Sequence, residues 1–189
     1  MRVISGSARG RRLKGPPSHG TRPMADKIRE ALFSVLASLG VEADRVLDLY
    51  AGTGSIGIEA LSRGASWCDF VEQNAAAARV VRENLASVGF ADRGNVHQMS
   101  VMAFLRTVSQ PYDLVILDPP YAAPDILETL EATGCSGAVT DGTIIAIGHS
   151  PRVDLPERVG TLVKLRGRCH GDSCFAVYDV VLSDARSSM

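Results

Sequence analysis

The sequence predicts an α/β protein in which a mostly parallel sheet carries helices on both faces. From residue 45 onward, short apolar runs typical of strands alternate with segments of helical periodicity. The first apolar run leads into a glycine-rich turn and a new helix. The last two apolar runs have no helix between them, so we expect them to pair antiparallel.

The expected elements follow in order along the chain. A helix is expected at 24–39, where apolar residues recur at helical spacing and Gly40 follows as a C-cap. Strands are expected at 45–49, 67–72, 95–99, 112–117 and 142–148, and helices at 55–63, 74–87, 101–109 and 124–132. The final pair of strands is expected at 161–166 and 175–182.

The net charge of −1 is unevenly distributed. Residues 1–25 contain six basic residues and no acid, so residues 26–189 carry −7. A basic segment on an acidic body is typical of an arm that binds a polyanion, and its glycines suit a hairpin or an extended arm. We therefore divide the chain into a basic arm at 1–20 and a domain at 21–189. We expect removal of residues 1–14 to leave the domain folded.

Length and composition exclude several classes of protein. A chain of 189 residues with 46% hydrophobic content is one domain with an ample core. No run approaches the length of a membrane span, and nothing at the N-terminus indicates export. The four cysteines lack the spacing of a metal site, so we expect reduced thiols and no metal. We also expect the protein to be cytoplasmic and monomeric.

The glycine-rich turn, Gly52-Thr53-Gly54, predicts a cofactor site. Glycines let the backbone approach a ligand, and the following helix directs its N–H groups at the turn. Asp48, at the end of the first strand, would repel a pyrophosphate but attract the ammonium of a methionine moiety. Glu72 ends the next strand and suits a ribose diol, which dinucleotides and S-adenosylmethionine both have. The turn and Asp48 together favour S-adenosylmethionine.

A second motif, Asp118-Pro119-Pro120-Tyr121, follows the fourth expected strand. The first and fourth strands are expected to be neighbours at the topological switch point, which would place Asp118 beside the glycine turn. The prolines remove two N–H donors and leave an acceptor-rich corner at the Asp118 carboxylate and Pro119 carbonyl. Such a corner accepts both N–H groups of an exocyclic amine, and Tyr121 offers a face for base stacking. We therefore predict methyl transfer to an exocyclic nitrogen, with Asp118 as proton acceptor.

Together these motifs resemble S-adenosylmethionine-dependent methyltransferases that act on exocyclic amino groups. The segment 20–33, preceded by Gly6, Arg9-Gly10-Arg11 and Leu13, is similar to the RsmD family of 16S ribosomal RNA guanine-N2 methyltransferases. The resemblance covers most of the chain. It implies a Rossmann-like, seven-stranded, mostly parallel sheet with an antiparallel last strand, and ribosomal RNA as partner, within the small subunit or its precursor.

The predicted site residues fall into three groups. The catalytic group is Asp118, Pro119, Pro120 and Tyr121. The cofactor-binding group is Asp48, Tyr50, Gly52, Thr53, Gly54, Glu72, Gln73, Ser100, Val101 and Asp118. The RNA-binding group is Arg2, Arg9, Arg11, Arg12, Lys14 and Arg22.

Two positions depart from the family pattern. Ser100 stands where the family often has an amide or acid near the adenine, so backbone and apolar contacts are expected there instead. His149 stands where the family often has an acid after the fifth strand, and we expect an exposed histidine at a strand end.

Other functions are compatible with parts of this pattern. An N6-adenine methyltransferase on DNA or RNA stays open, because Asp-Pro-Pro-Tyr does not choose between bases. A non-catalytic RNA-binding module would explain the arm but not the turn, Glu72 and the second motif together. A protein-glutamine methyltransferase would begin the motif with Asn. Cytosine-C5 chemistry needs a cysteine, usually after a proline, and Asp48 disfavours a nicotinamide enzyme.

Overall fold

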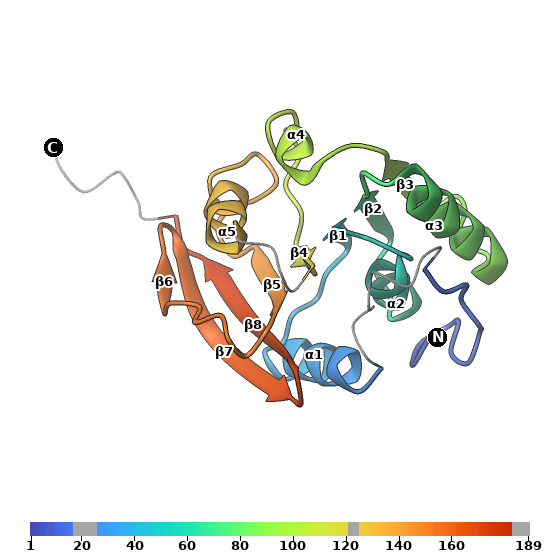
Figure 1. Ribbon diagram of the computed structural model, residues 1–189, viewed down its shortest axis with the longest axis horizontal. Helices are drawn as coiled ribbons and strands as arrows, with labels where there is room; N and C mark the ends of the chain where they lie inside the picture. The colour runs from blue at the N-terminus through green and yellow to red at the C-terminus, as the bar shows by residue number, and fades with distance from the viewer. Residues whose placement is uncertain (17–25, 121–124, 183–189) are drawn as a thin grey trace, which may run out of the picture.

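The computed structural model describes residues 1–16, 26–120 and 125–182 (Figure 1). The helices are α1 (Asp26–Ser38), α2 (Ser55–Ser62), α3 (Ala75–Val88), α4 (Val101–Leu105) and α5 (Ile126–Gly134). The strands are β1 (Arg45–Leu49), β2 (Trp67–Val71), β3 (Gly94–His97), β4 (Leu114–Leu117), β5 (Ile144–His149), β6 (Arg158–Val159), β7 (Leu162–His170) and β8 (Ser173–Val180). Within these ranges, no helix is long and apolar enough to cross a membrane.

The strands form a single sheet in the order β3-β2-β1-β4-β5-β8-β7-β6. The first five are parallel, and β8, β7 and β6 continue antiparallel, which confirms the predicted arrangement. The described sheet has eight strands rather than seven, because the two-residue β6 adds to the edge of β7. Chain order reverses between β1 and β4, and this makes the switch point where α/β sheets bind ligands.

Helices cover both faces of the sheet, as expected. The apolar residues of α1, α2 and α3 pack with one set of strand side chains, including Val46 and Phe70. Those of α4 and α5 pack on the opposite face with the alternate set, including Leu47 and Val115. Fully burying a Val, Leu or Phe side chain contributes about 1.5–3 kcal/mol, so these two layers supply most of the driving force for folding.

Several element ends have identifiable causes. The Asn74 side chain caps α3 by accepting from the Ala76 and Ala77 amides, at 2.9 and 3.1 Å. Helix α4 ends at Leu105 rather than 109, because the amides at 107 and 108 both turn back to the Phe104 carbonyl. β7 and β8 extend beyond their expected bounds to the turn at Gly171, whose φ of +59° suits glycine. Residues 24–25 and 124 of the expected helices lie outside the described residues.

The N-terminal arm is a hairpin that is docked on the domain. Arg2 and Arg12 form an antiparallel bridge, while Val3, Ala8 and Leu13 are buried in the core. This packing contradicts the expectation that residues 1–14 can be removed without harm to folding. The basic residues lie on the exposed face of the hairpin, whereas its other face is apolar and packs into the core. The boundary at residue 20 lies outside the described residues.

Buried charges fix this hairpin to α2. Glu59 is fully buried and accepts from the Ile4 amide at 2.7 Å, the Ser5 amide at 3.0 Å and the Arg63 Nε at 2.8 Å. Arg29 of α1 is also fully buried and donates to the Arg2 carbonyl at 2.7 Å. Its Nε lies 4.0 Å from the Glu59 carboxylate. One buried ion pair therefore connects the hairpin, α1 and α2.

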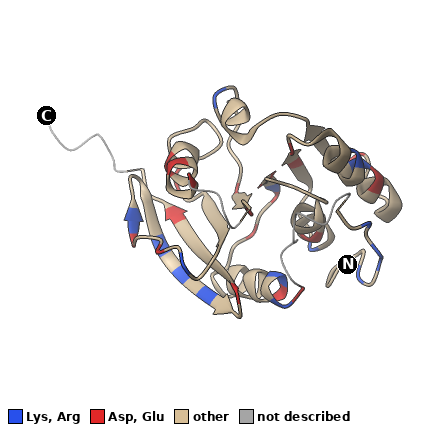
Figure 2. Cartoon of the chain, in the orientation of Figure 1, with Lys and Arg blue, Asp and Glu red and all other residues tan. Residues whose placement is uncertain are grey.

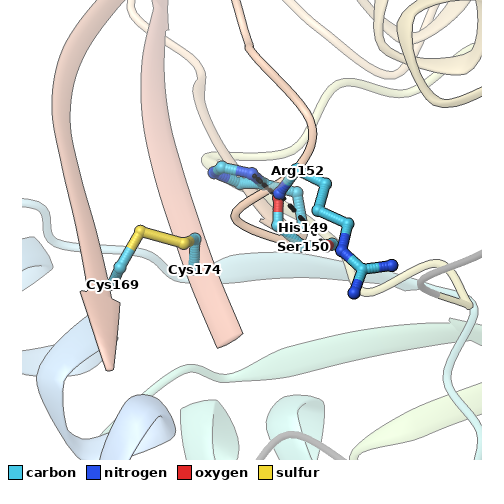
Figure 3. Close-up of a disulfide and its surroundings, with 5 residues drawn as sticks. All are labelled: His149, Ser150, Arg152, Cys169 and Cys174. Carbon is cyan, nitrogen blue, oxygen red and sulfur yellow. Dashed lines mark hydrogen bonds between the residues drawn. A yellow bond between two sulfur atoms is a disulfide. The ribbon is translucent and has the colours of Figure 1, made fainter. Parts of the chain in front are cut away.

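The cysteines differ from the expectation of four reduced thiols. Cys169 and Cys174 form a disulfide across the β7–β8 hairpin (Figure 3). The ladder places these residues directly opposite each other, with their Cα atoms 4.0 Å apart, and sequence spacing alone does not reveal that register. Cys68 and Cys135 are free, the first buried and the second exposed.

Candidate active site

Three strand ends meet at the carboxyl edge of the sheet. β1 lies between β2 and β4, and Leu49 pairs with both Val71 and Leu117. The next residue of each strand is therefore Tyr50, Glu72 or Asp118, and these three residues lie side by side. The structure thus brings together the predicted glycine turn, the predicted ribose acid and the second motif.

The backbone of the turn leaves room for a ligand at its first glycine. Gly52 has a φ of +58°, and a Cβ placed on it would approach only the Tyr50 carbonyl, at 3.9 Å. Gly54 serves packing instead, since its Cβ would lie 2.8 Å from a methyl of Val81. Tyr50 itself has a φ of +62°, an uncommon conformation for a residue with a side chain, and such strain clusters at functional sites.

Glu72 organises the turn. Its Oε2 accepts from the Gly52 amide at 2.9 Å, and its Oε1 accepts from the Asn74 amide at 2.7 Å. Each carboxylate oxygen can accept more than one hydrogen bond, so Glu72 keeps capacity for a further donor such as a hydroxyl. The half-buried side chain therefore fixes the loop beside Gly52.

Asp48 is the buried charge of this site. Its Oδ2 accepts from the Gly57 amide at 2.9 Å, whereas its Oδ1 has no partner among the described residues. Burial raises the pKa of Asp48 to about 7; the Gly57 amide opposes the shift, and the charges of Asp118 and Glu72 add to it. A buried carboxylate with an unsatisfied oxygen and two acidic neighbours is suited to a cation.

The second motif begins at the neighbouring strand end. The Asp118 amide donates to the Leu49 carbonyl at 3.4 Å, which holds the start of the motif against β1. Asp118 is half-buried, Pro119 is buried and Pro120 is exposed. Tyr121 lies outside the described residues, so its predicted stacking role stays a prediction.

The remaining predicted cofactor residues surround this centre. Ser100 caps α4 by accepting from the Ala103 amide at 3.2 Å, and Val101 is buried beside it. Gln73 is exposed next to Glu72. Thr53 is buried, and its hydroxyl lies 3.4 Å from the Met1 sulfur. The hairpin therefore reaches the cofactor turn.

His149 is half-buried rather than exposed. Its Nδ1 lies 2.9 Å from the Ser150 carbonyl, and burial lowers its pKa. Because Leu117 pairs with Ile147, the end of β5 lies level with the second motif. The side chain is covered because the loop after β5 folds back over the strand end.

Sequence reasoning missed Asn84 of α3. Its side chain donates to the carbonyls of Thr53 and Lys14, at 2.9 and 3.2 Å, and accepts from the Lys14 amide at 2.8 Å. Asn84 thus joins the cofactor turn to the hairpin. The available signal was an amide between buried Val81 and Leu85 in a helical pattern.

The predicted RNA-binding residues are spread along the hairpin. The five within the described chain, Arg2, Arg9, Arg11, Arg12 and Lys14, are exposed, and Arg22 lies outside it. Arg11 donates to the Ser87 carbonyl at 3.1 Å, near the end of α3, and Lys14 pairs with Glu83 at 2.7 Å. The hairpin therefore runs from the cofactor turn toward the opposite edge of the sheet.

A cavity of about 800 Å³ lies at that opposite edge. Its lining includes Leu36, Asp44 and Asp113, which precede or face the amino ends of β1 and β4. It is therefore separate from the strand ends that carry Asp48, Glu72 and Asp118.

Comparisons with known proteins agree with this geometry. The family described as "Conserved hypothetical protein 95" matches residues 1–179. "Putative rRNA methyltransferase YlbH" of Bacillus subtilis is 34% identical over 181 residues, covering 94% of this chain and 98% of its own. "Ribosomal RNA small subunit methyltransferase D" of Escherichia coli (strain K12) is 33% identical over 178 residues, covering 94% and 89%. The solved structure "Putative methyltransferase yhhF from Escherichia coli" superposes with a TM-score of 0.83 at 31% identity, covering 96% and 98%.

Proposed function

Because this chain belongs to the RsmD family of ribosomal RNA small-subunit methyltransferases, we propose that it methylates the exocyclic N2 of a guanine in 16S ribosomal RNA. The methyl donor in this proposal is S-adenosylmethionine. The observation that carries the proposal is the meeting of Asp48, Glu72 and Asp118 around one glycine turn, at the ends of three adjacent strands.

The residues of the turn fit the chemical groups of this cofactor. Asp48 would hold the ammonium, which satisfies the orphaned Oδ1 and favours the ionised carboxylate. The turn at Gly52 and the N-terminus of α2 would receive the carboxylate. Glu72 would accept from the ribose hydroxyls, and Val101 would pack near the adenine. When bound, the cofactor supplies a methyl group on a positively charged sulfur.

Asp118 would act as the proton acceptor. A guanine amino group is a poor nucleophile because its lone pair is conjugated with the ring. By accepting a hydrogen bond from that amine, Asp118 draws the nitrogen toward a tetrahedral geometry and orients its lone pair. As the new N–C bond forms, the methyl–sulfur bond breaks and its electron pair stays on sulfur. One amine proton leaves to Asp118 and then to water.

The cellular setting is part of the same proposal. The protein acts as a cytoplasmic monomer on the small ribosomal subunit or its precursor. An N6-adenine methyltransferase uses the same acceptor corner, so the base has to be identified directly.

Nucleoside mass spectrometry tests this function. Purified protein is incubated with isotopically labelled S-adenosylmethionine and either free 16S ribosomal RNA or small subunits, and the RNA is then digested. We expect labelled N2-methylguanosine with wild type and none with Asp118→Ala. Labelled N6-methyladenosine would replace the guanine assignment, and retention of RNA without any labelled nucleoside would favour a binding module.

A further inference from the structure

β7 is a basic strand on an acidic body. Lys164, Arg166 and Arg168 fall within five residues, and no acid occurs in Leu162–His170. Residues 26–189 as a whole sum to −7, so this strand reverses the local sign of charge. Figure 2 shows basic residues along β7, on the opposite side of the molecule from the N-terminal hairpin.

The β7–β8 hairpin, Leu162–Val180, turns at the same edge of the sheet as the active site. β8 is antiparallel to β5 with Cys174 opposite His149, and Cys169 of β7 faces Cys174. His149 lies level with the second motif, so the end of β7 emerges beside it. Three strand spacings separate β4 from β7, which is about 14 Å.

A groove follows this hairpin. It has a volume of about 500 Å³ and is lined by His149, Lys164, Arg166, Arg168, Cys169 and Phe175, among others. None of the residues that line it comes from β1 or β2, so it is distinct from the cofactor turn. Its lining includes both the basic strand and His149 at the end of β5.

Two of the three basic side chains are available to a ligand. Lys164 donates to the Leu155 carbonyl at 2.9 Å and to Glu157 at 3.2 Å, so it secures the neighbouring loop. Arg166 and Arg168 are exposed, and neither forms an ion pair with any residue in the described ranges. Arg166 donates one hydrogen bond, to the Leu165 carbonyl at 3.0 Å, which leaves its other N–H groups for a ligand. Both stand on a strand held by the β8 ladder and the disulfide.

We propose that the β7–β8 hairpin, through Arg166 and Arg168, binds the phosphate backbone of the substrate RNA beside the target nucleotide. This inference rests on the proposed RNA substrate. A guanidinium offers a planar pair of donors that matches a phosphate, and a preorganised strand limits the entropy lost on binding. The distance of about 14 Å from β4 to β7 is short enough for one RNA strand to reach from the active site to this hairpin.

Two double variants, each lacking two arginines, test whether the β7–β8 hairpin binds RNA. Arg166→Ala/Arg168→Ala is compared with Arg79→Ala/Arg106→Ala, which removes one exposed arginine from α3 and one that directly follows α4. Binding of labelled 16S ribosomal RNA is followed by fluorescence anisotropy over a potassium chloride series, and S-adenosylmethionine affinity by calorimetry. We expect the hairpin variant to lose about tenfold in RNA affinity and up to about 0.7–0.9 in salt slope for each lost contact. Cofactor affinity should stay at the wild-type value.

The outcomes separate this inference from the proposed reaction. Equal losses in the hairpin variant and the control variant, or no loss in either, would overturn the hairpin as an RNA-binding surface. A wild-type protein that binds RNA without methylating it would refute the reaction, while the hairpin result would still decide the binding surface. A wild-type protein that does not bind RNA even at low salt would overturn both.

Discussion

Asp48 couples the pH of the solution to cofactor binding. Its pKa of about 7 lies above the ordinary value of 3.8, so the unfolded chain loses this proton first as pH rises. Asp48 therefore reduces the stability of the cofactor-free protein increasingly between about pH 4 and pH 7, after which its cost is constant. A bound ammonium would favour the ionised form and offset this cost.

Asp48→Asn tests that coupling. We expect wild-type affinity for S-adenosylmethionine to rise as pH increases toward 7 and then to level off, because ionised Asp48 attracts the ammonium. The variant should bind more weakly, lose this pH dependence and melt at a higher temperature than wild type at pH 8 without cofactor. Calorimetry and thermal melts across pH measure both effects, with Asp92→Asn, at an exposed loop residue, as control. A wild-type affinity independent of pH would contradict the role given to Asp48.

Substitution of Asp118 should affect the methylation rate, whereas substitution of Glu72 should affect cofactor binding. Asp118→Ala is expected to lower the single-turnover methylation rate by about 10²-fold or more, with cofactor affinity nearly unchanged, because it removes one positioned proton acceptor. Glu72→Ala is expected to weaken S-adenosylmethionine binding by about 1–3 kcal/mol, since it loses charge-assisted hydrogen bonds. The assignment of the two carboxylates would be wrong if Asp118→Ala kept full turnover or Glu72→Ala kept full affinity.

The hairpin, α1 and α2 depend on the buried pair of Glu59 and Arg29. Glu59→Ala leaves the buried Arg29 guanidinium with Asp26, at 3.0 Å, as its remaining carboxylate partner among the described residues, and it removes the acceptor of two hairpin amides. We expect the free energy of unfolding in urea to fall by about 3–5 kcal/mol, as for other broken buried pairs. Glu83→Ala removes the exposed partner of Lys14 and should cost far less, because solvent screens this pair. Similar costs for the two variants would show that Glu59 does not secure the hairpin.

The disulfide in the β7–β8 hairpin determines which cysteines should react with a thiol reagent. Cys68 is buried, Cys135 is exposed and the other two cysteines are joined. In native, non-reduced protein, we expect a maleimide to label Cys135 alone. Reduction of the disulfide should make the thiols of Cys169 and Cys174 available for labelling as well. Intact-mass spectrometry counts the labels. Rapid labelling of three thiols without reductant would contradict the disulfide.

The sequence predicts the residues of the site better than it predicts the long-range contacts that hold the surrounding elements in place. The glycine turn, Glu72 and Asp118 follow apolar strands directly, so local pattern and parallel topology place them together. The register of β7 against β8 depends on a bulge between Lys164 and Arg166 and is set by long-range pairing. The hairpin amides that Glu59 accepts from lie more than 50 residues away in sequence, and no local periodicity indicates them.

Charge averaged over a long segment also conceals local features. Residues 26–189 total −7, which favoured the N-terminal arm as the one place dense in positive charge. The structure adds the basic strand β7 within that acidic segment. In Figure 2 the hairpin and β7 lie on opposite sides of the molecule, and the strand ends that carry the site lie between them.

This arrangement predicts that one RNA contacts both basic surfaces. Arg9→Ala/Arg11→Ala/Arg12→Ala changes exposed side chains and keeps the buried Val3, Ala8 and Leu13, so the protein should stay folded with wild-type cofactor affinity. We expect weaker RNA binding and a salt slope reduced by up to about 0.7–0.9 per lost phosphate contact. Phosphate contacts position the strand without reading its sequence, so the loss should be similar for mutated RNA targets.

Combining this triple variant with Arg166→Ala/Arg168→Ala tests whether the two surfaces hold the same RNA molecule. The hairpin packs against α2 and α3, whereas β7 lies near the other end of the strand order, and the two sets of residues share no partner. Their effects on binding free energy should therefore add for an RNA that spans the active site. Fluorescence anisotropy with 16S ribosomal RNA and with a short single-stranded RNA makes the comparison. With the short RNA, too small to reach both surfaces, the losses in binding free energy should not add, because each RNA molecule then contacts one surface or the other. Losses that fail to add with 16S ribosomal RNA would mean that each surface binds RNA independently, without a path through the active site.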